Sequence, residues 1–253
     1  MENDKWKMIS KSQPIDTLSL RVLLWDLDGT LVRGKRFGAF KDYTVPMLET
    51  VFGTAGCLHD LVVSGMTDLQ IVEEALRTEG ITREHINSRR DELLACYMDE
   101  MKRATGNGLQ ILEAMPGAHE VLKAVNEHPR YASALLTGNI EPAAHLKVEL
   151  TGLAQFFPLP GAFGNESFDR RDLPAIAAQR INEHLGAQLK PEQFIVIGDT
   201  PNDIACARHF GARVLAVATG RMHSQEDLLA YGPDALLPDL LDAELVIRTL
   251  EKL

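Results

Sequence analysis

Short apolar runs alternate with helix-like segments through most of the chain. After Pro116 the helix-like segments include AHEVLKAVNEH, PAAHLKVELTG and LPAIAAQRINEHLG, each with apolar residues at helical spacing. The strand-like runs cover residues 20–25, 132–136, 162–163 (a weak one), 194–197 and 214–217. A helix between two strands carries the chain back to the edge where the first strand began, so the strands run parallel. The pattern predicts an α/β fold with a Rossmann-like parallel sheet.

One long segment departs from this alternation. Between about residues 36 and 112 there is no convincing strand, but helical patterns occur in VPMLETVFG, in DLQIVEEALRTEG ending at Gly80, and over 83–104. A block of this length is too large for a simple crossover. We therefore expect a helical cap at 36–112, inserted into a core made of 15–35 and 113–253, with RGKRFG on one side and GNGLQ with MPG on the other as linkers.

Charge and cysteine content narrow the functional class. The formal net charge is -10, and no block of Lys and Arg offsets it, which argues against binding to nucleic acid or to an anionic membrane. The three cysteines, Cys57, Cys96 and Cys206, are far apart and form no CxxC pair, so we expect neither a disulfide framework nor a zinc ribbon. With no signal-peptide pattern and no apolar run of membrane-spanning length, the sequence predicts a soluble, cytoplasmic protein.

Polar residues follow three of the strand-like runs directly. RVLLW is followed by Asp26, SALL by Thr137-Gly138-Asn139, and FIVIG by Asp199. The carboxyl ends of the strands in an open parallel sheet share one edge, and ligands bind there. We expect these three segments to converge on one crevice.

The chemistry of that crevice indicates phosphoryl transfer. Asp26 and Asp28 leave the same face of a strand because side chains alternate, and Asp199 and Asp203 of GDTPND bring the carboxylates to as many as four. A hard divalent cation with oxygen ligands, Mg²⁺ in the first instance, makes such crowding tolerable. Beside it lie the Thr137 hydroxyl and the N–H groups of Gly138 and Asn139, at a helix start that suits a phosphate. Each motif alone is common in turns and caps; the combination in this order is far more specific.

Three quoted segments resemble a known family. DLDGTLV (26–32), LLTGN (135–139) and VIGDTPNDIACA (196–207) are similar to the first, second and fourth signature motifs of the haloacid dehalogenase superfamily, and the helical insert lies where phosphoglycolate-phosphatase-like members carry a cap. The resemblance covers the chain from about residue 20 to its end.

The resemblance implies roles for the four aspartates. Asp26 would be the nucleophile that forms an aspartyl-phosphate, and Asp28 the general acid/base. Mg²⁺ would be held by the Asp26 carboxylate, the Asp28 backbone carbonyl and Asp199, with Asp203 supporting the metal through water or from a second layer. Dehalogenase members lack the second aspartate, so Asp28 favours a phosphatase.

The family also uses a Lys or Arg against the phosphate, and two places offer one. Lys190 in LKPEQ precedes the strand that ends near Asp199, and at about 3.3 Å per residue it would lie roughly 16 Å away, at the wrong edge. Arg170 and Arg171 in GNESFDRRDLP follow the weak strand and precede a helix that Asp172 could cap, so they emerge at the correct edge. We predict Arg170, with Arg171 as the alternative.

Taken together, the residues predict a Mg²⁺-dependent phosphatase acting on a small phosphorylated metabolite. Thr67 in SGMTDLQ is either the N-cap of a helix, the simpler interpretation, or a substrate contact from a cap loop. One alternative is a phosphomutase of the same superfamily, which returns the phosphoryl group to substrate. Another is a non-catalytic phosphate-binding or receiver-like module, which would need neither Asp28 nor a cap. The identity of the metabolite and the oligomeric state are not predicted.

Overall fold

The core of the protein is a six-stranded parallel sheet. The computed structural model describes residues 17, 19–36, 38–106 and 112–253. The strands lie in the order β5-β4-β1-β6-β7-β8, and every neighbouring pair is parallel. Their bounds are β1 Arg21–Trp25, β4 Tyr131–Thr137, β5 Ala162–Phe163, β6 Phe194–Gly198, β7 Arg213–Val217 and β8 Ala235–Leu237. The predicted α/β fold is confirmed, and β8 is a strand that the sequence analysis missed because its three residues are too few to show a pattern.

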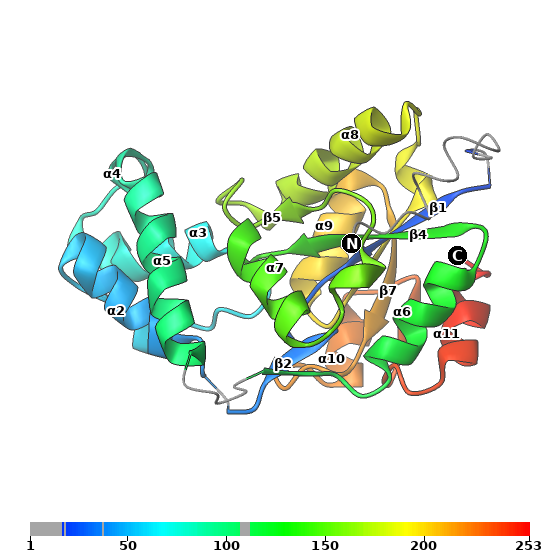
Figure 1. Cartoon of the computed structure of the whole chain (residues 1–253), viewed down its shortest axis with the longest axis horizontal. Helices are drawn as coiled ribbons and strands as arrows, with labels where there is room; N and C mark the ends of the chain where they lie inside the picture. The colour runs from blue at the N-terminus through cyan, green and yellow to red at the C-terminus, as the bar shows by residue number, and fades with distance from the viewer. Residues whose placement is uncertain (1–16, 18, 37, 107–111) are drawn as a thin grey trace.

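Helices cover both faces of this sheet (Figure 1). One face packs against α6 (Ala118–Glu127), α7 (Glu141–Leu150) and α11 (Ala243–Leu250), and the other against α8 (Leu173–Leu185), α9 (Pro201–Phe210) and α10 (Gln225–Ala230). Within β1, Leu23 and Trp25 join the first of these cores, while Val22 and Leu24 join the second. Because both faces are buried, the strands appear in the sequence as continuous apolar runs.

A helical insertion lies between β1 and β4. It contains α2 (Lys41–Phe52), α3 (Asp68–Leu76), α4 (Arg83–Ser88) and α5 (Arg90–Thr105), which gather to one side of the sheet in Figure 1. These helices bury a core of their own that includes Met47, Leu48, Leu69, Val72 and Leu93. An antiparallel pair, β2 (Val32–Gly34) with β3 (Leu112–Ala114), joins the two ends of the insertion to the core.

Two details of the insertion concern the predictions. The single helix expected over 83–104 is wrong: the chain breaks at Arg89, where the Ser88 hydroxyl donates to the His85 carbonyl at 2.7 Å and competes with helical bonding. The limits 36–112 for the cap and 15–35 with 113–253 for the core stay predictions. Residues 15–16, Phe37 of RGKRFG and 107–110 of GNGLQ lie outside the described residues.

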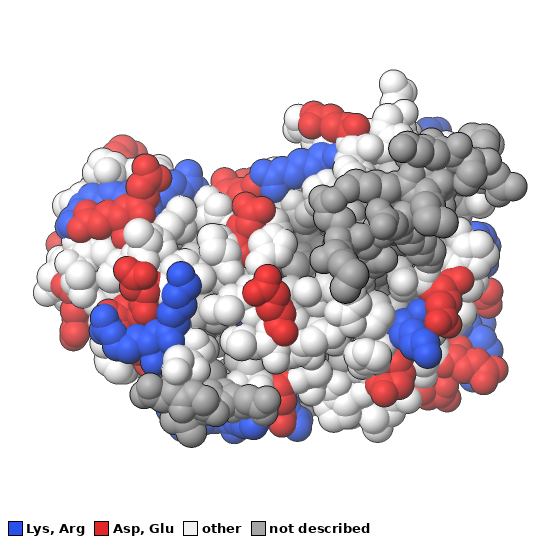
Figure 2. All heavy atoms as spheres, viewed as in Figure 1, with Lys and Arg blue, Asp and Glu red and all other residues white. Residues whose placement is uncertain are grey.

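Acidic and basic side chains are interspersed on the face seen in Figure 2. Several pair with each other at the surface, among them Arg83 with Glu73 at 2.6 Å and Arg213 with Asp234 at 3.0 Å. No helix in the described part of the chain combines the length and the apolar composition needed to cross a bilayer.

Candidate active site

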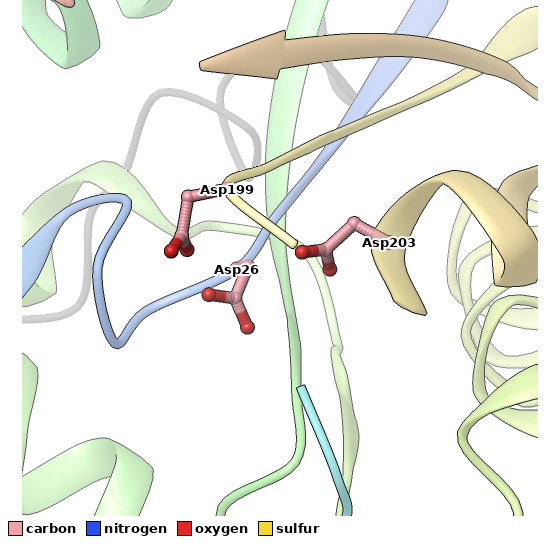
Figure 3. A group of neighbouring side chains, drawn as sticks. All are labelled: Asp26, Asp199 and Asp203. Atoms are coloured by element: carbon pink, nitrogen blue, oxygen red, sulfur yellow. The ribbon is translucent and has the colours of Figure 1, made fainter. Parts of the chain in front are cut away.

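Three aspartates meet at the carboxyl edge of the sheet. Asp26 directly follows β1, Asp199 directly follows the adjacent β6, and Asp203 lies in the first turn of α9. Figure 3 shows their carboxyl groups turned toward one another. One oxygen from each lies within 4.8 Å of those of the other two, and all three residues are buried. The ends of β1 and β6 therefore converge, as the sequence analysis predicted for two of its three segments.

If all three aspartates were ionised, they would carry more negative charge than Arg170, the cation that contacts them, can neutralise. Burial raises the pKa of Asp26 to about 7, although the Arg170 guanidinium acts in the opposite direction. Burial, with the neighbouring Asp26 and Asp203, also raises the pKa of Asp199 well above its ordinary value. Buried carboxylates with this excess of charge fit a hard divalent cation that prefers oxygen ligands. The aspartates could thus hold a metal ion.

The three carboxylates are not equally available to such an ion. Asp203 Oδ2 accepts hydrogen bonds from Thr200 N at 3.0 Å and Thr200 Oγ1 at 2.7 Å, and its Oδ1 accepts from Arg170 at 2.5 Å. Among the described residues, the Asp199 side chain accepts a single hydrogen bond, from the Thr30 hydroxyl at 3.0 Å. Asp26 and Asp199 are therefore the better direct ligands, while Asp203 is placed to orient Arg170 and the loop after β6.

Glycine is required beside Asp199. Gly29 has φ of 96°, and a Cβ there would lie 2.4 Å from an Asp199 carboxyl oxygen. The backbone of the turn after Asp28 therefore passes close to Asp199, and a side chain at residue 29 would prevent this approach.

Arg170 contacts Asp26, the predicted nucleophile. It lies in a short 3-10 helix, Arg170–Asp172, after β5, and is 5 % exposed. Its Nη2 donates to Asp26 Oδ1 at 2.7 Å and to Asp203 Oδ1 at 2.5 Å. Arg171 instead pairs with Asp169 at the surface, and Lys190 is exposed at the opposite end of β6. Asp172 stands at the N-cap position of α8, as predicted, but its side chain makes no capping hydrogen bond there. The preceding 3-10 turn is capped by Asp169, which accepts from the Arg171 N–H.

Asp28 lies in a different environment from Asp26. Its side chain, 47 % exposed, accepts hydrogen bonds from Lys147 Nζ at 2.8 and 2.6 Å and from Asn139 Nδ2 at 2.7 Å. Lys147 is buried in α7 and also donates to Asn139 Oδ1 at 2.6 Å. Burial opposes the charge of this lysine, but Asp28 and Tyr43 outweigh it and raise the pKa of Lys147 above its ordinary value.

The sequence analysis missed Lys147. A signal was present, because Lys147 follows Ala143 and Ala144 at helical spacing and so lies on the buried stripe of α7. A lysine on an apolar stripe is either a long side chain that reaches solvent or a buried cation with a partner. Only the position of Asp28 across the site distinguishes the two.

The predicted phosphate-binding segment has the expected position. Thr137 ends β4 and is buried, and its hydroxyl accepts from Asn139 Nδ2 at 2.7 Å. A Cβ at Gly138 would lie 2.0 Å from the Met66 carbonyl oxygen, so this glycine lets the insertion approach closely. Thr67 is buried and caps α3 by accepting from Gln70 N at 3.1 Å. Thr67 is not among the residues that line the cavity described next, and its contact with substrate stays a prediction.

A cavity of about 220 Å³ lies between the core and the insertion. Its core side is lined by the residues just described: Asp26, Asp28, Thr137, Gly138, Asn139, Lys147 and Arg170. The insertion closes over it through hydrogen bonds from Asp68 N to the Gly138 carbonyl at 2.7 Å, from Ile140 N to Asp68 Oδ2 at 2.8 Å and from Asn202 Nδ2 to the Ser64 carbonyl at 3.1 Å. The proposed catalytic groups thus face a partly open cavity of small-molecule size.

The chain is similar in sequence to several known proteins. A family model described as HAD-hydrolase-like matches residues 172–243. A phosphoglycolate phosphatase from Vibrio vulnificus is 24 % identical over 245 residues, which cover 90 % of this chain and 97 % of that protein. The pyrophosphatase PpaX from Oceanobacillus iheyensis is 22 % identical over 230 residues, which cover 89 % of this chain and 95 % of that protein.

A solved structure gives the same fold. A haloacid dehalogenase-like family hydrolase from Streptococcus pneumoniae has a TM-score of 0.58 at 22 % identity, with 92 % of this chain and 99 % of that one covered. The fold is thus shared with this structure, and in sequence the chain is similar over most of its length to haloacid dehalogenase-like hydrolases.

Proposed function

We propose that the protein is a Mg²⁺-dependent phosphatase that hydrolyses a small phosphorylated metabolite through a phosphoryl group carried on Asp26. The observation that carries this proposal is the placement of Asp26 between Arg170 and Asp199, with Asp28 facing the same cavity. The relatives named as a phosphoglycolate phosphatase and a pyrophosphatase, both of which release phosphate, support the reaction class.

Asp26 would attack phosphorus. Arg170 binds its Oδ1 at 2.7 Å and fixes the plane of the carboxylate, which leaves Oδ2 for the new bond. Arg170 would also neutralise charge on the transferred phosphoryl oxygens, with Thr137 and the start of α7 beside them. Held by Asp26 and Asp199, Mg²⁺ would reduce the repulsion between the attacking carboxylate and those oxygens.

Asp28 would move the proton. In the first half-reaction the bond between phosphorus and the ester oxygen breaks, and Asp28 protonates that oxygen as the alcohol leaves. In the second half-reaction water attacks the phosphoryl group on Asp26, and Asp28 takes a proton from the water, so that phosphate is released and both carboxyl groups return to their starting states. Lys147 and Asn139 hold the Asp28 side chain at the cavity.

The test is release of inorganic phosphate from p-nitrophenyl phosphate, with Mg²⁺ or with excess chelator. We expect turnover only with the metal, and no turnover or acid-stable phosphoenzyme in Asp26→Asn, because an amide is a poor nucleophile. Full turnover in excess chelator, or a wild-type rate in Asp26→Asn, would contradict the mechanism. Oxygen from labelled water should appear in the released phosphate, whereas a mutase would return the phosphoryl group to a sugar hydroxyl.

A further inference from the structure

The part of the cavity that would receive the leaving alcohol is formed by the insertion. Tyr43 of α2, Asp68 and Ile71 of α3, and Tyr97 and Met101 of α5 line it, opposite the catalytic groups of the core. The Tyr43 and Tyr97 rings meet edge to face with centroids 5.2 Å apart. The walls are thus aromatic and apolar, with one carboxylate among them.

The positive charges of this cavity are already paired. Among the described residues that line it, the cations are Lys147 and Arg170. Lys147 lies 2.6 Å from an Asp28 oxygen, and Arg170 lies within 2.7 Å of Asp26 and Asp203. The insertion contributes no cation to the lining in the described part of the chain, so a second anionic group on a substrate would meet no free counter-charge there.

Other arginines lie near this site, but they line a different cavity. Arg33, Arg36 and Arg221 line a neighbouring cavity, which also includes Asp199. The two cavities share Asp28, Gly34 and Ser64 in their linings. Arg33 pairs with Glu113 at 2.6 Å, Arg36 pairs with Asp42, and Arg221 donates to the Gly34 carbonyl at 3.3 Å. These three side chains are absent from the lining of the cavity under the insertion.

Asp68 is a fixed acceptor in that cavity. Its Oδ2 accepts from Ile140 N at 2.8 Å, and the Tyr97 hydroxyl donates to the same carboxyl group. Burial raises the pKa of Asp68 to about 6, so the group is mostly ionised at and above neutral pH. An ionised carboxylate attracts O–H and N⁺–H donors and repels anions.

We propose that this cavity selects phosphate monoesters whose alcohol part ends in a hydroxyl or ammonium group, and disfavours those whose alcohol part carries a second anion. This inference rests on the phosphatase function proposed above. It separates the protein from what the names of its relatives imply, because the glycolate released from phosphoglycolate carries a carboxylate, and pyrophosphate releases a second phosphate. A cavity of about 220 Å³ restricts the alcohol to a small one.

Three esters of similar length test the proposal. 2-Phosphoglycolate, 2-hydroxyethyl phosphate and O-phosphoethanolamine end in a carboxylate, a hydroxyl and an ammonium group. We expect kcat/KM for the hydroxyl and ammonium esters to exceed that for phosphoglycolate by about tenfold or more near neutral pH, since like charges repel in a cavity of low dielectric. This comparison uses the unmodified protein and does not depend on a variant that folds.

Asp68→Asn assigns the preference to one side chain. The amide keeps an oxygen that can accept the Ile140 N–H but loses the charge, so the preference for phosphoethanolamine over phosphoglycolate should fall by about tenfold. Asp60→Asn, at an exposed position elsewhere in the insertion, is the matched control and should leave the ratio unchanged.

Two results would overturn the inference and leave the phosphatase function standing: phosphoglycolate as the best of the three esters, or an unchanged ratio in Asp68→Asn. Failure to release phosphate from any of them and from p-nitrophenyl phosphate would instead overturn the proposed function, and this inference with it.

Discussion

Replacing Arg170 with alanine tests the site at its most densely charged point. Arg170 is 5 % exposed and bridges Asp26 and Asp203 at 2.7 and 2.5 Å. Its loss leaves two buried carboxylates without their cation, a change that typically costs about 3–5 kcal/mol of unfolding free energy. We expect the lower end of that range, because Asp26, whose pKa burial already raises to about 7, can take up a proton and relieve part of the repulsion.

Turnover should fall as well. Loss of a charge-assisted contact to the transferred phosphoryl group is worth about 2.7–4 kcal/mol of transition-state stabilisation, or on the order of 10²- to 10³-fold in kcat. Urea denaturation without metal measures the stability, and hydrolysis of p-nitrophenyl phosphate with Mg²⁺ measures the rate. Mg²⁺ should restore part of the lost stability by replacing the missing positive charge.

The neighbouring residue supplies the control. Arg171 has a side chain 58 % exposed and pairs with Asp169 at the surface, so Arg171→Ala should cost less than about 1 kcal/mol and leave turnover nearly unchanged. Lys190→Ala should also have little effect. If Arg170→Ala and Arg171→Ala lose equal stability and rate, or if Lys190→Ala abolishes turnover, the assignment of Arg170 is wrong.

The pKa of Asp26, the Asp28–Lys147 ion pair and the Thr67 cap can each be tested separately. Burial raises the pKa of Asp26 to about 7, above an unfolded value of about 3.9, so the stability that the protonated group adds to the metal-free protein is complete below about pH 4 and is lost as pH rises through 7. Thermal denaturation should therefore show that Mg²⁺ raises Tm more at pH 8 than at pH 6. A Tm shift that does not depend on pH would contradict this. Lys147→Met and Asp28→Asn should each lower kcat by about 10²- to 10⁴-fold, since both disrupt the proton-transfer group. A wild-type kcat in Lys147→Met would show that the ion pair between Lys147 and Asp28 is not needed for catalysis. Thr67→Ala should cost about 0.5–2 kcal/mol of unfolding free energy through loss of the α3 cap and affect natural and aryl substrates equally; a larger loss on the natural substrate would instead indicate substrate contact.

Local sequence determined the architecture of the core. Strands that are apolar throughout and alternate with helices bury both faces of their sheet when the sheet is parallel and lies between two layers of helices. The apolar periodicity that predicts this can be seen in the local sequence. The sequence predicted that Asp26, Thr137 and Asp199 lie close together, because a strand end is a local feature and the carboxyl ends of parallel strands share an edge. The same edge argument favoured Arg170 over Lys190, which the fold holds at opposite ends of the sheet.

Tertiary structure decided which side chains from different elements contact each other at the site. Lys147 is one more helix lysine in the sequence, and its burial against Asp28 depends on the packing of α7 against β5 and into the core cluster that it shares with β1 and β4. The facing of Asp68 and Tyr97 into the cavity is likewise set by how the insertion closes on the loop after β4, through bonds between residues about 70 positions apart. Periodicity predicts which face of an element is buried, whereas the group that meets it from another element is fixed by packing, which a linear pattern does not contain.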